Sequence, residues 1–168
     1  EVAEEFIQSG QADCVVVVCD GTSLERNLIL ALQVLQRQSQ AVVCVNLMDE
    51  AERSCIQIDC PALEAALGVP VVATAAGQGR GMAQLRSAIE QVSSGRRICT
   101  PHRLPPDYTP RDLVARAEAV AKQVVLRGES RYQKRQLQLD RLLTSRLTGL
   151  PVMLALLLLV VWLTISGA

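Results

Sequence analysis

The sequence is poor in several features that mark common classes of protein. Aromatic residues make up 2% of its 168 residues, and His102 is the single histidine. None of the six cysteines forms a C-x-x-C pair or lies in a cluster with histidine, which argues against a zinc site or a disulfide scaffold. Basic and acidic side chains number 17 each, so the chain has no excess of positive charge that would attract nucleic acid. We therefore expect no metal site and no nucleic-acid partner, and reduced thiols fit a cytosolic location.

The charges that are present are divided unevenly along the chain. Residues 1–95 hold 5 basic and 12 acidic side chains, whereas residues 96–147 hold 12 basic and 5 acidic ones. Residues 148–168 carry no charge, and a helix of that length rises about 30 Å, the thickness of the hydrocarbon core of a membrane. We predict a membrane helix there, with residues 1–147 in the cytoplasm because the basic residues precede it. A buried core helix is the alternative.

Hydrophobic periodicity predicts an α/β fold with a parallel sheet and flanking helices. Apolar runs rich in β-branched residues have the pattern of strands buried on both faces, at residues 14–19, 41–45 and 69–73. Helices are predicted at residues 22–38, 61–67 and 82–92. The first is expected to open with a capping box formed by Thr22 and Glu25. Strands alternating with helices at this spacing are typical of right-handed crossover units.

A proline-rich linker precedes a second helical region. Four of the seven prolines lie between residues 101 and 110, and a helix is predicted from Pro110 to about Gly128. Its apolar face is expected to consist of Leu113, Ala117, Val120, Val124 and Val125. Residues 130–146 also have a helical pattern but are basic. We interpret residues 101–146 as a small helical unit between the sheet and a membrane.

Polar residues follow the predicted strands, at the edge where open parallel sheets bind ligands. Asp20, Asn46, Asp49 and the loop 74–81 fall at this edge. Asn46-x-x-Asp49, directly after a buried strand, resembles the guanine-recognition motif of translational-type GTPases. Its carboxylate can accept both N1–H and the N2 amine of guanine, a pair of donors that adenine does not offer. Asp49 is therefore predicted to select GTP over ATP, and Asn46 to tie the loop to the base edge. In the alternative, Asp20 and Asp49 merely cap helices.

Several stretches together resemble the bacterial ferrous iron transport protein B family, FeoB. They are residues 20–28, 46–51, 58–59, 67–72 and 139–153, the last running into residues 162–168. The resemblance implies a partial P-loop GTPase-type sheet. Residues 1–95 would form the carboxyl-terminal half of a GTPase domain, residues 96–147 a helical region that modulates nucleotide release, and residues 148–168 the first transmembrane helix.

The resemblance also implies a guanine site. Its residues would be Asn46, Leu47, Asp49, Thr74, Ala75 and Ala76. Leu47 stands where most small GTPases have lysine, and it would cover the ring of the base. The family loop commonly has serine at the position of Ala75, so a hydroxyl that stiffens the loop is expected to be missing, whereas the backbone donor of Ala76 is kept.

As a whole, the resemblance implies a part of a GTP-dependent Fe²⁺ transporter of the bacterial inner membrane. Its partners would be GTP or GDP, the lipid bilayer and the transported Fe²⁺. Its cofactors would be GTP and Mg²⁺, and a homo-oligomer is possible. The sequence contains no G-x-x-x-x-G-K-[ST] phosphate loop and no D-x-x-G motif. Catalytic and Mg²⁺-binding residues for GTP hydrolysis are therefore expected outside this sequence, in a longer parent. The alternatives are a membrane-anchored regulatory GTPase that moves no ion, and a sheet domain without a nucleotide site.

Overall fold

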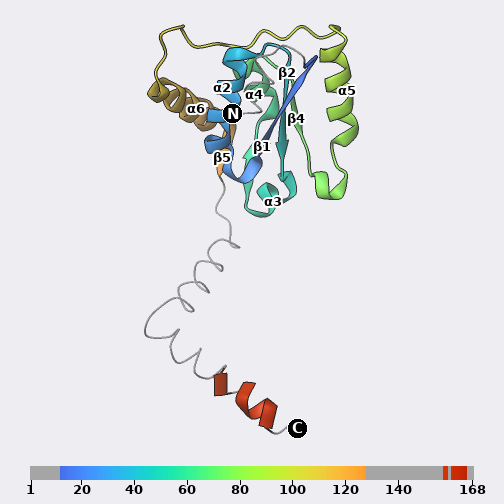
Figure 1. Cartoon of the computed structure of the whole chain (residues 1–168), viewed down its shortest axis with the longest axis vertical. Coiled ribbons are helices and arrows are strands. Elements are labelled where there is room, and N and C mark those ends of the chain that lie inside the picture. Colours follow the sequence, from blue (N-terminus) through green and yellow to red (C-terminus); the bar gives the residue numbers. More distant parts are fainter. Residues whose placement is uncertain (1–11, 128–156, 159, 166–168) are drawn as a thin grey trace. The chain divides into compact units, whose positions relative to one another are not determined.

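The sheet consists of three parallel strands (Figure 1). The computed structural model describes residues 12–127, 157–158 and 160–165. Within them, the strands β1 (Val15–Asp20), β2 (Ala41–Asn46) and β4 (Val71–Ala73) lie in the order β1-β2-β4. Asp20 pairs with Asn46 and Val45 pairs with Ala73, so the carboxyl ends of the three strands meet at one edge of the sheet. The predicted parallel sheet is confirmed.

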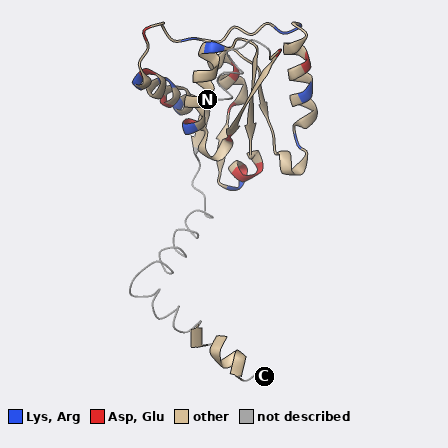
Figure 2. Ribbon diagram, in the orientation of Figure 1, with Lys and Arg blue, Asp and Glu red and all other residues tan. Residues whose placement is uncertain are grey.

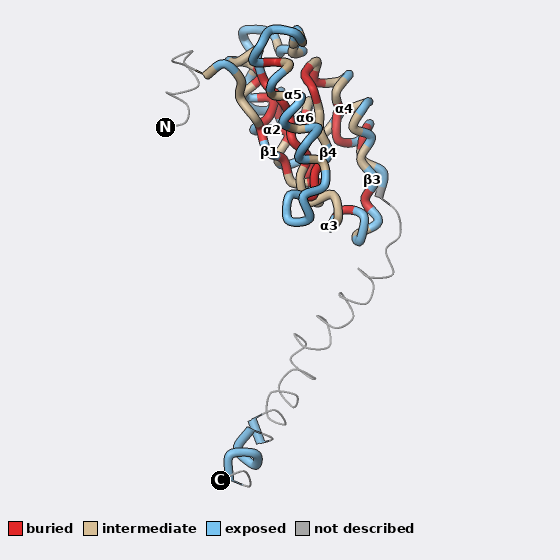
Figure 3. Tube along the Cα trace, turned by 90° about the vertical axis from the view of Figure 1, so that its right-hand side faces the viewer, coloured by how far each residue is buried: buried red, intermediate tan, exposed pale blue. Residues whose placement is uncertain are grey.

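Each face of the sheet has its own apolar core. On one face, Val43 and Val45 pack with side chains of the helices α2 (Leu24–Arg37), α4 (Cys60–Leu67) and α6 (Pro110–Val124). On the other face, Val42 packs with α5 (Met82–Ser93). The first five residues of β2 are buried, which explains why this strand shows no polar alternation. In Figure 3, buried stretches run through the interior of the sheet region, and exposed stretches lie on its outside. Val18 of β1, in contrast, is 57% exposed.

The helices of the sheet region begin and end close to the predicted residues. α2 ends at Arg37, and α4 ends before Gly68, whose φ of +74° is the left-handed conformation that glycine adopts most readily. The predicted capping box of Thr22 and Glu25 is wrong. The carboxylate of Asp20 accepts hydrogen bonds from the backbone and the hydroxyl of Thr22, both at 2.7 Å, so that hydroxyl donates to Asp20. Asp20 thus caps the short helix η1 (Gly21–Ser23), and α2 begins only after it.

Two short strands and a short helix were not predicted. β3 (Ile56–Ile58) pairs antiparallel with β5 (Val125–Arg127), and α3 (Met48–Arg53) directly follows β2. Val125, which we expected on the apolar face of a helix, belongs to β5 because α6 ends one residue earlier. Neither β3 nor β5 contains the run of valines that predicted the other strands.

The helix α6 packs on the sheet region. Its capping box is formed by Thr109 and Asp112, and its apolar face joins the core of α2 and α4. Four of the five residues predicted for that face are buried in it: Leu113, Ala117, Val120 and Val124. The division of the chain into 1–95, 96–147 and 148–168 stays a prediction.

Part of the predicted architecture lies outside the described residues. This holds for the basic segment 130–146 and for most of the predicted membrane helix 148–168. Residues 157–158 and 160–165 are helical and exposed. Among the residues that the structure describes, no helix combines the length and the apolar character that a membrane crossing requires.

Candidate functional site

Asn46 joins the end of β2 to the loop that follows β4. Its side-chain oxygen Oδ1 accepts a hydrogen bond from the hydroxyl of Thr74 at 3.1 Å and from the backbone N–H of Ala76 at 3.0 Å. The backbone adds two more links, because the N–H of Thr74 donates to the carbonyl of Val45 and the N–H of Met48 donates to the carbonyl of Thr74. The parallel register makes these contacts available, since β2 and β4 are neighbours and end at the same edge. The contact between Asn46 and the loop is thus present, whereas the predicted tie to the base edge stays a prediction.

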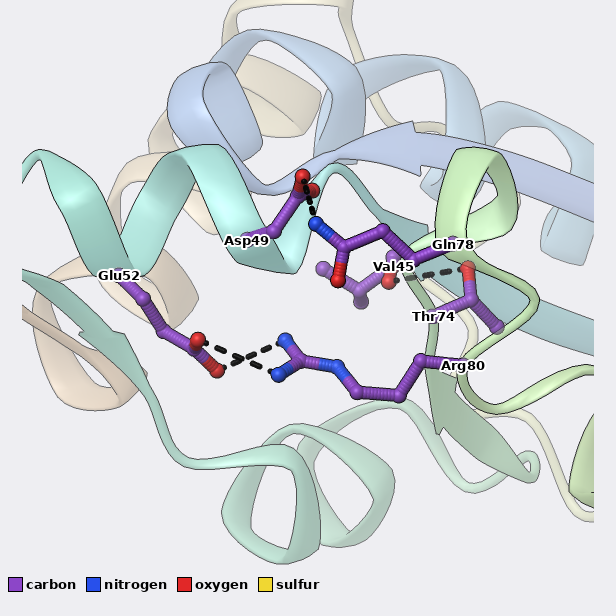
Figure 4. Close-up of polar contacts among 6 residues, drawn as sticks. All are labelled: Val45, Asp49, Glu52, Thr74, Gln78 and Arg80. Carbon is purple, nitrogen blue, oxygen red and sulfur yellow. Dashed lines mark hydrogen bonds and ion pairs between the residues drawn. The ribbon is translucent and has the colours of Figure 1, made fainter.

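The hydroxyl of Thr74 supplies the stiffening that we expected to be missing from this loop. Thr74 is fully buried, and its Oγ1 also lies 3.5 Å from the carbonyl oxygen of Val45 (Figure 4) and 3.2 Å from Sγ of Cys44. The loop therefore has no hydroxyl at Ala75, but the hydroxyl of Thr74, one residue earlier, is hydrogen-bonded to Asn46. Position 75 lacks the serine hydroxyl, as expected, and Thr74 supplies a hydroxyl from the preceding position.

Leu47 and Asp49 belong to the turn into α3. Leu47 has a φ of +60°, and its carbonyl accepts hydrogen bonds from the N–H groups of Glu50 and Ala51. Asp49 thus lies in the first turn of α3, one residue inside the helix, and its side chain makes no cap. Its carboxylate Oδ2 accepts a hydrogen bond of 2.9 Å from the side-chain amide of Gln78. The capping alternative is correct for Asp20 and wrong for Asp49.

The loop 74–81 folds back on itself and lies against α3. Ala75 and Arg80 form an antiparallel bridge around the single turn η2 (Ala76–Gln78). The fold requires glycine at position 81, because its φ is +82° and an added Cβ would lie 2.2 Å from the carbonyl oxygen of Ala73. The guanidinium of Arg80 pairs with both carboxylate oxygens of Glu52, at 2.8 and 3.3 Å (Figure 4).

The charges around the loop are mainly acidic. α3 carries the acidic residues Asp49, Glu50 and Glu52 and the basic residue Arg53, and Arg80 of the loop pairs with Glu52. Figure 2 shows the acidic colour on this short helix. Asp49 remains a partly exposed carboxylate beside the backbone of the loop. A carboxylate in this position can accept two parallel N–H donors from a planar ligand.

Three of the six cysteines are poorly suited to chemistry because their thiols are protonated. Burial, with a smaller contribution from Cys44, raises the pKa of Cys19 to about 12. Burial likewise raises the pKa of Cys14 and of Cys60. These thiols therefore stay protonated at neutral pH and are weak ligands and nucleophiles. In the described part of the chain, no three histidine, cysteine, aspartate or glutamate side chains gather into a group that could hold a metal ion.

The structure brings most of the predicted site residues into direct contact. Thr74 and Ala76 both donate hydrogen bonds to Oδ1 of Asn46, and Ala75 between them is buried. Asp49 reaches the same loop through Gln78. Sequence reasoning missed Gln78 and Arg80, although both belong to the glycine-rich stretch Gly77-Gln-Gly-Arg-Gly81. For Arg80, its charge opposite to that of the acidic residues of α3 could have indicated the contact with Glu52. For Gln78, the sequence offered no such signal.

Comparison with known proteins gives one consistent family. The family model described as "Ferrous iron transport protein B" matches residues 1–89. A protein named Fe(2+) transporter FeoB from Salmonella typhimurium is 36% identical over 119 residues, which are 71% of this chain. The chain spans 15% of the length of that relative.

Solved structures of similar proteins share the fold. The G domain of FeoB from Methanococcus jannaschii is 36% identical, with a TM-score of 0.54 over 55% of this chain and 60% of that one. A mutant of NFeoB from S. thermophilus, bound to GDP, is 30% identical, with a TM-score of 0.56 over 73% of this chain and 43% of that one.

Proposed function

The chain belongs to the ferrous iron transport protein B family, and from this premise we propose that it supplies guanine recognition in a GTP-dependent Fe²⁺ transporter. The match of the family model to residues 1–89 and the parallel sheet support the proposal. We propose GTP hydrolysis, transport of Fe²⁺ and location in the inner membrane for the complete protein. They are proposals here, since the chain spans 15% of the length of its relative.

The observation that carries the proposal is the meeting of three segments at one edge of the sheet. Asn46 ends β2, Asp49 lies in the first turn of α3, and the loop 74–81 is bonded to both. In the proposed complex, the two oxygens of Asp49 accept N1–H and the N2 amine of guanine. Adenine has no such pair of donors, and a carboxylate left unpaired against it is unfavourable. The S. thermophilus relative bound to GDP supports a guanine nucleotide as the ligand.

The other site residues hold the loop and the base in place. Asn46 fixes the loop through Thr74 and Ala76. The N–H of Ala76 already donates to Asn46, so in the proposed complex it is shared between that oxygen and the guanine carbonyl, as bifurcated bonds allow. The side chain of Leu47 covers the ring of the base, and the buried Ala75 supports the turn.

The remaining parts of the chain have proposed roles in coupling. Residues 96–147 would pass a nucleotide-dependent change to residues 148–168, the proposed first transmembrane helix, which carry no charge. Mg²⁺ supports phosphoryl transfer in GTPases by neutralising phosphate charge. We assign no residue of this chain to it, because the sequence contains no phosphate-loop motif.

The substitution Asp49→Asn in the full-length protein tests the proposal. An asparagine amide can donate to the C2 carbonyl of xanthine, whereas it repels the N2 amine of guanine. We expect GDP affinity to fall by about tenfold or more and xanthosine diphosphate affinity to rise, as estimated for a charge-assisted hydrogen bond. Equilibrium titration with both nucleotides measures the two changes.

Glu50→Gln is the matched control, because Glu50 neighbours Asp49 on α3 and is exposed. It removes the same charge without touching the proposed base contact. The preference for guanine should persist in this variant. An unchanged preference in Asp49→Asn as well would show that Asp49 does not bind the base.

A further inference from the structure

Gln78 binds the carboxylate that the proposed site needs for the base. Its side-chain amide Nε2 donates to Oδ2 of Asp49 at 2.9 Å (Figure 4). A guanine edge would offer N–H donors to the same carboxylate, and it needs both oxygens at once. Oδ2 has two lone pairs, and one of them already accepts from the glutamine amide, so the amide and the base meet at this oxygen.

The loop can release Gln78 without leaving its place on α3. Arg80 holds the loop through Glu52, which lies one helical turn after Asp49, and Asn46 holds it through Ala76. These two contacts do not involve the side chain of Gln78. A rotamer change of this exposed side chain is thus sufficient to free Asp49, and such changes are fast compared with nucleotide binding.

We propose that Gln78 is an internal competitor of the guanine base, which occupies Asp49 in the nucleotide-free protein and must leave before the base binds. This inference rests on the proposed role of Asp49 in base recognition. Only the fraction of molecules with Asp49 free is competent to bind, and the apparent dissociation constant rises as that fraction falls. Gln78 thereby weakens nucleotide binding by slowing association, while dissociation is unchanged.

Gln78→Ala and Gln78→Met in the full-length protein test the proposal. Methionine keeps the approximate length of the side chain and removes the donor. We expect both variants to bind fluorescent N-methylanthraniloyl-GDP with an association rate about two- to tenfold higher, the range of one hydrogen bond in solvent. The dissociation rate, measured by chase with unlabelled GDP in a stopped-flow instrument, should stay unchanged.

Gln91→Ala is the matched control. Gln91 lies on α5, and its Nε2 donates an exposed hydrogen bond to the hydroxyl of Ser87. Gln91→Ala therefore removes a glutamine hydrogen bond similar to that of Gln78, but away from the site. This control should leave both rates as they are. An unchanged association rate in the Gln78 variants would overturn the proposal. A faster dissociation rate would also overturn it, because it would show that Gln78 holds the base in place.

Failure of this inference and failure of the proposed function give different results. If Asp49→Asn changes the base preference but Gln78→Ala leaves association unchanged, only the competition is wrong. If Asp49→Asn leaves the base preference unchanged, the proposed base contact itself is wrong. In an Asp49→Ala background the Gln78→Ala change should have no effect, since a double-mutant cycle isolates the contact between the two side chains.

Discussion

The side-chain oxygen of Asn46 and the backbone N–H of Ala76 are joined by a hydrogen bond of 3.0 Å that spans 30 residues of sequence. Thr74 donates its hydroxyl to the same oxygen. One amide side chain therefore positions the loop 74–81 relative to the central strand of the sheet. This side chain acts together with the backbone hydrogen bonds of Thr74 and Met48 and with the pair of Arg80 and Glu52.

Asn46→Ala should loosen the loop. The exposed N–H of Ala76 loses its acceptor, and the buried hydroxyl of Thr74 is left with the carbonyl of Val45 at 3.5 Å, so the loop loses two hydrogen bonds of about 0.5–1.5 kcal/mol each. Hydrogen–deuterium exchange of peptides that cover residues 74–81 measures this local opening. Asn46→Asp keeps a side-chain oxygen and should protect the loop better than alanine. Equal protection in wild type and Asn46→Ala would contradict the role of this side chain.

Gly81→Ala should destabilise the protein more than Gly79→Ala. Both glycines have positive φ, +82° and +70°, so alanine pays about 1–2 kcal/mol at either position for the left-handed backbone. At Gly81, the added Cβ also meets the carbonyl oxygen of Ala73 at 2.2 Å, whereas nothing lies within 4 Å at Gly79. Urea unfolding followed by far-ultraviolet circular dichroism compares the two variants. Equal losses would contradict the close approach at Gly81.

The thiols should differ in their reaction with a disulfide reagent at pH 8. Cys55 is exposed and should react at once, whereas Cys19 is fully buried and should react only on unfolding, because its pKa is raised to about 12. Cys55→Ser should remove the fast phase of the reaction. Rapid labelling of Cys19 in the folded protein would contradict its burial.

The raised pKa of Cys19 also predicts how stability depends on pH. Its ordinary pKa is 9.0, and the folded protein keeps the thiol protonated up to about pH 12. The unfolded chain therefore binds fewer protons than the folded one between these values. This contribution to stability is complete below about pH 9 and is lost as the pH rises toward 12. A Cys19→Ala variant should show a weaker decline of its unfolding midpoint over that range.

The sequence predicted the sheet and the meeting of the site residues because both follow from strong periodic signals. The valine-rich run 41–45 is buried throughout, and parallel strands bring their carboxyl ends to one edge, which fixes Asn46 and the loop 74–81 as neighbours. The sequence predicted the apolar face of α6 but not its packing on α2, because a periodic pattern shows that a face is buried and not which element covers it. The contact between Gln78 and Asp49 depends on the turn of a glycine-rich loop, which sequence pattern does not determine.

A structure of the full-length protein with GDP tests the central claim most directly. The account predicts that both oxygens of Asp49 lie about 2.7–3.2 Å from N1 and N2 of guanine, with Gln78 turned away from them. A base bound elsewhere, or bound while Asp49 keeps its hydrogen bond to Gln78, would contradict it.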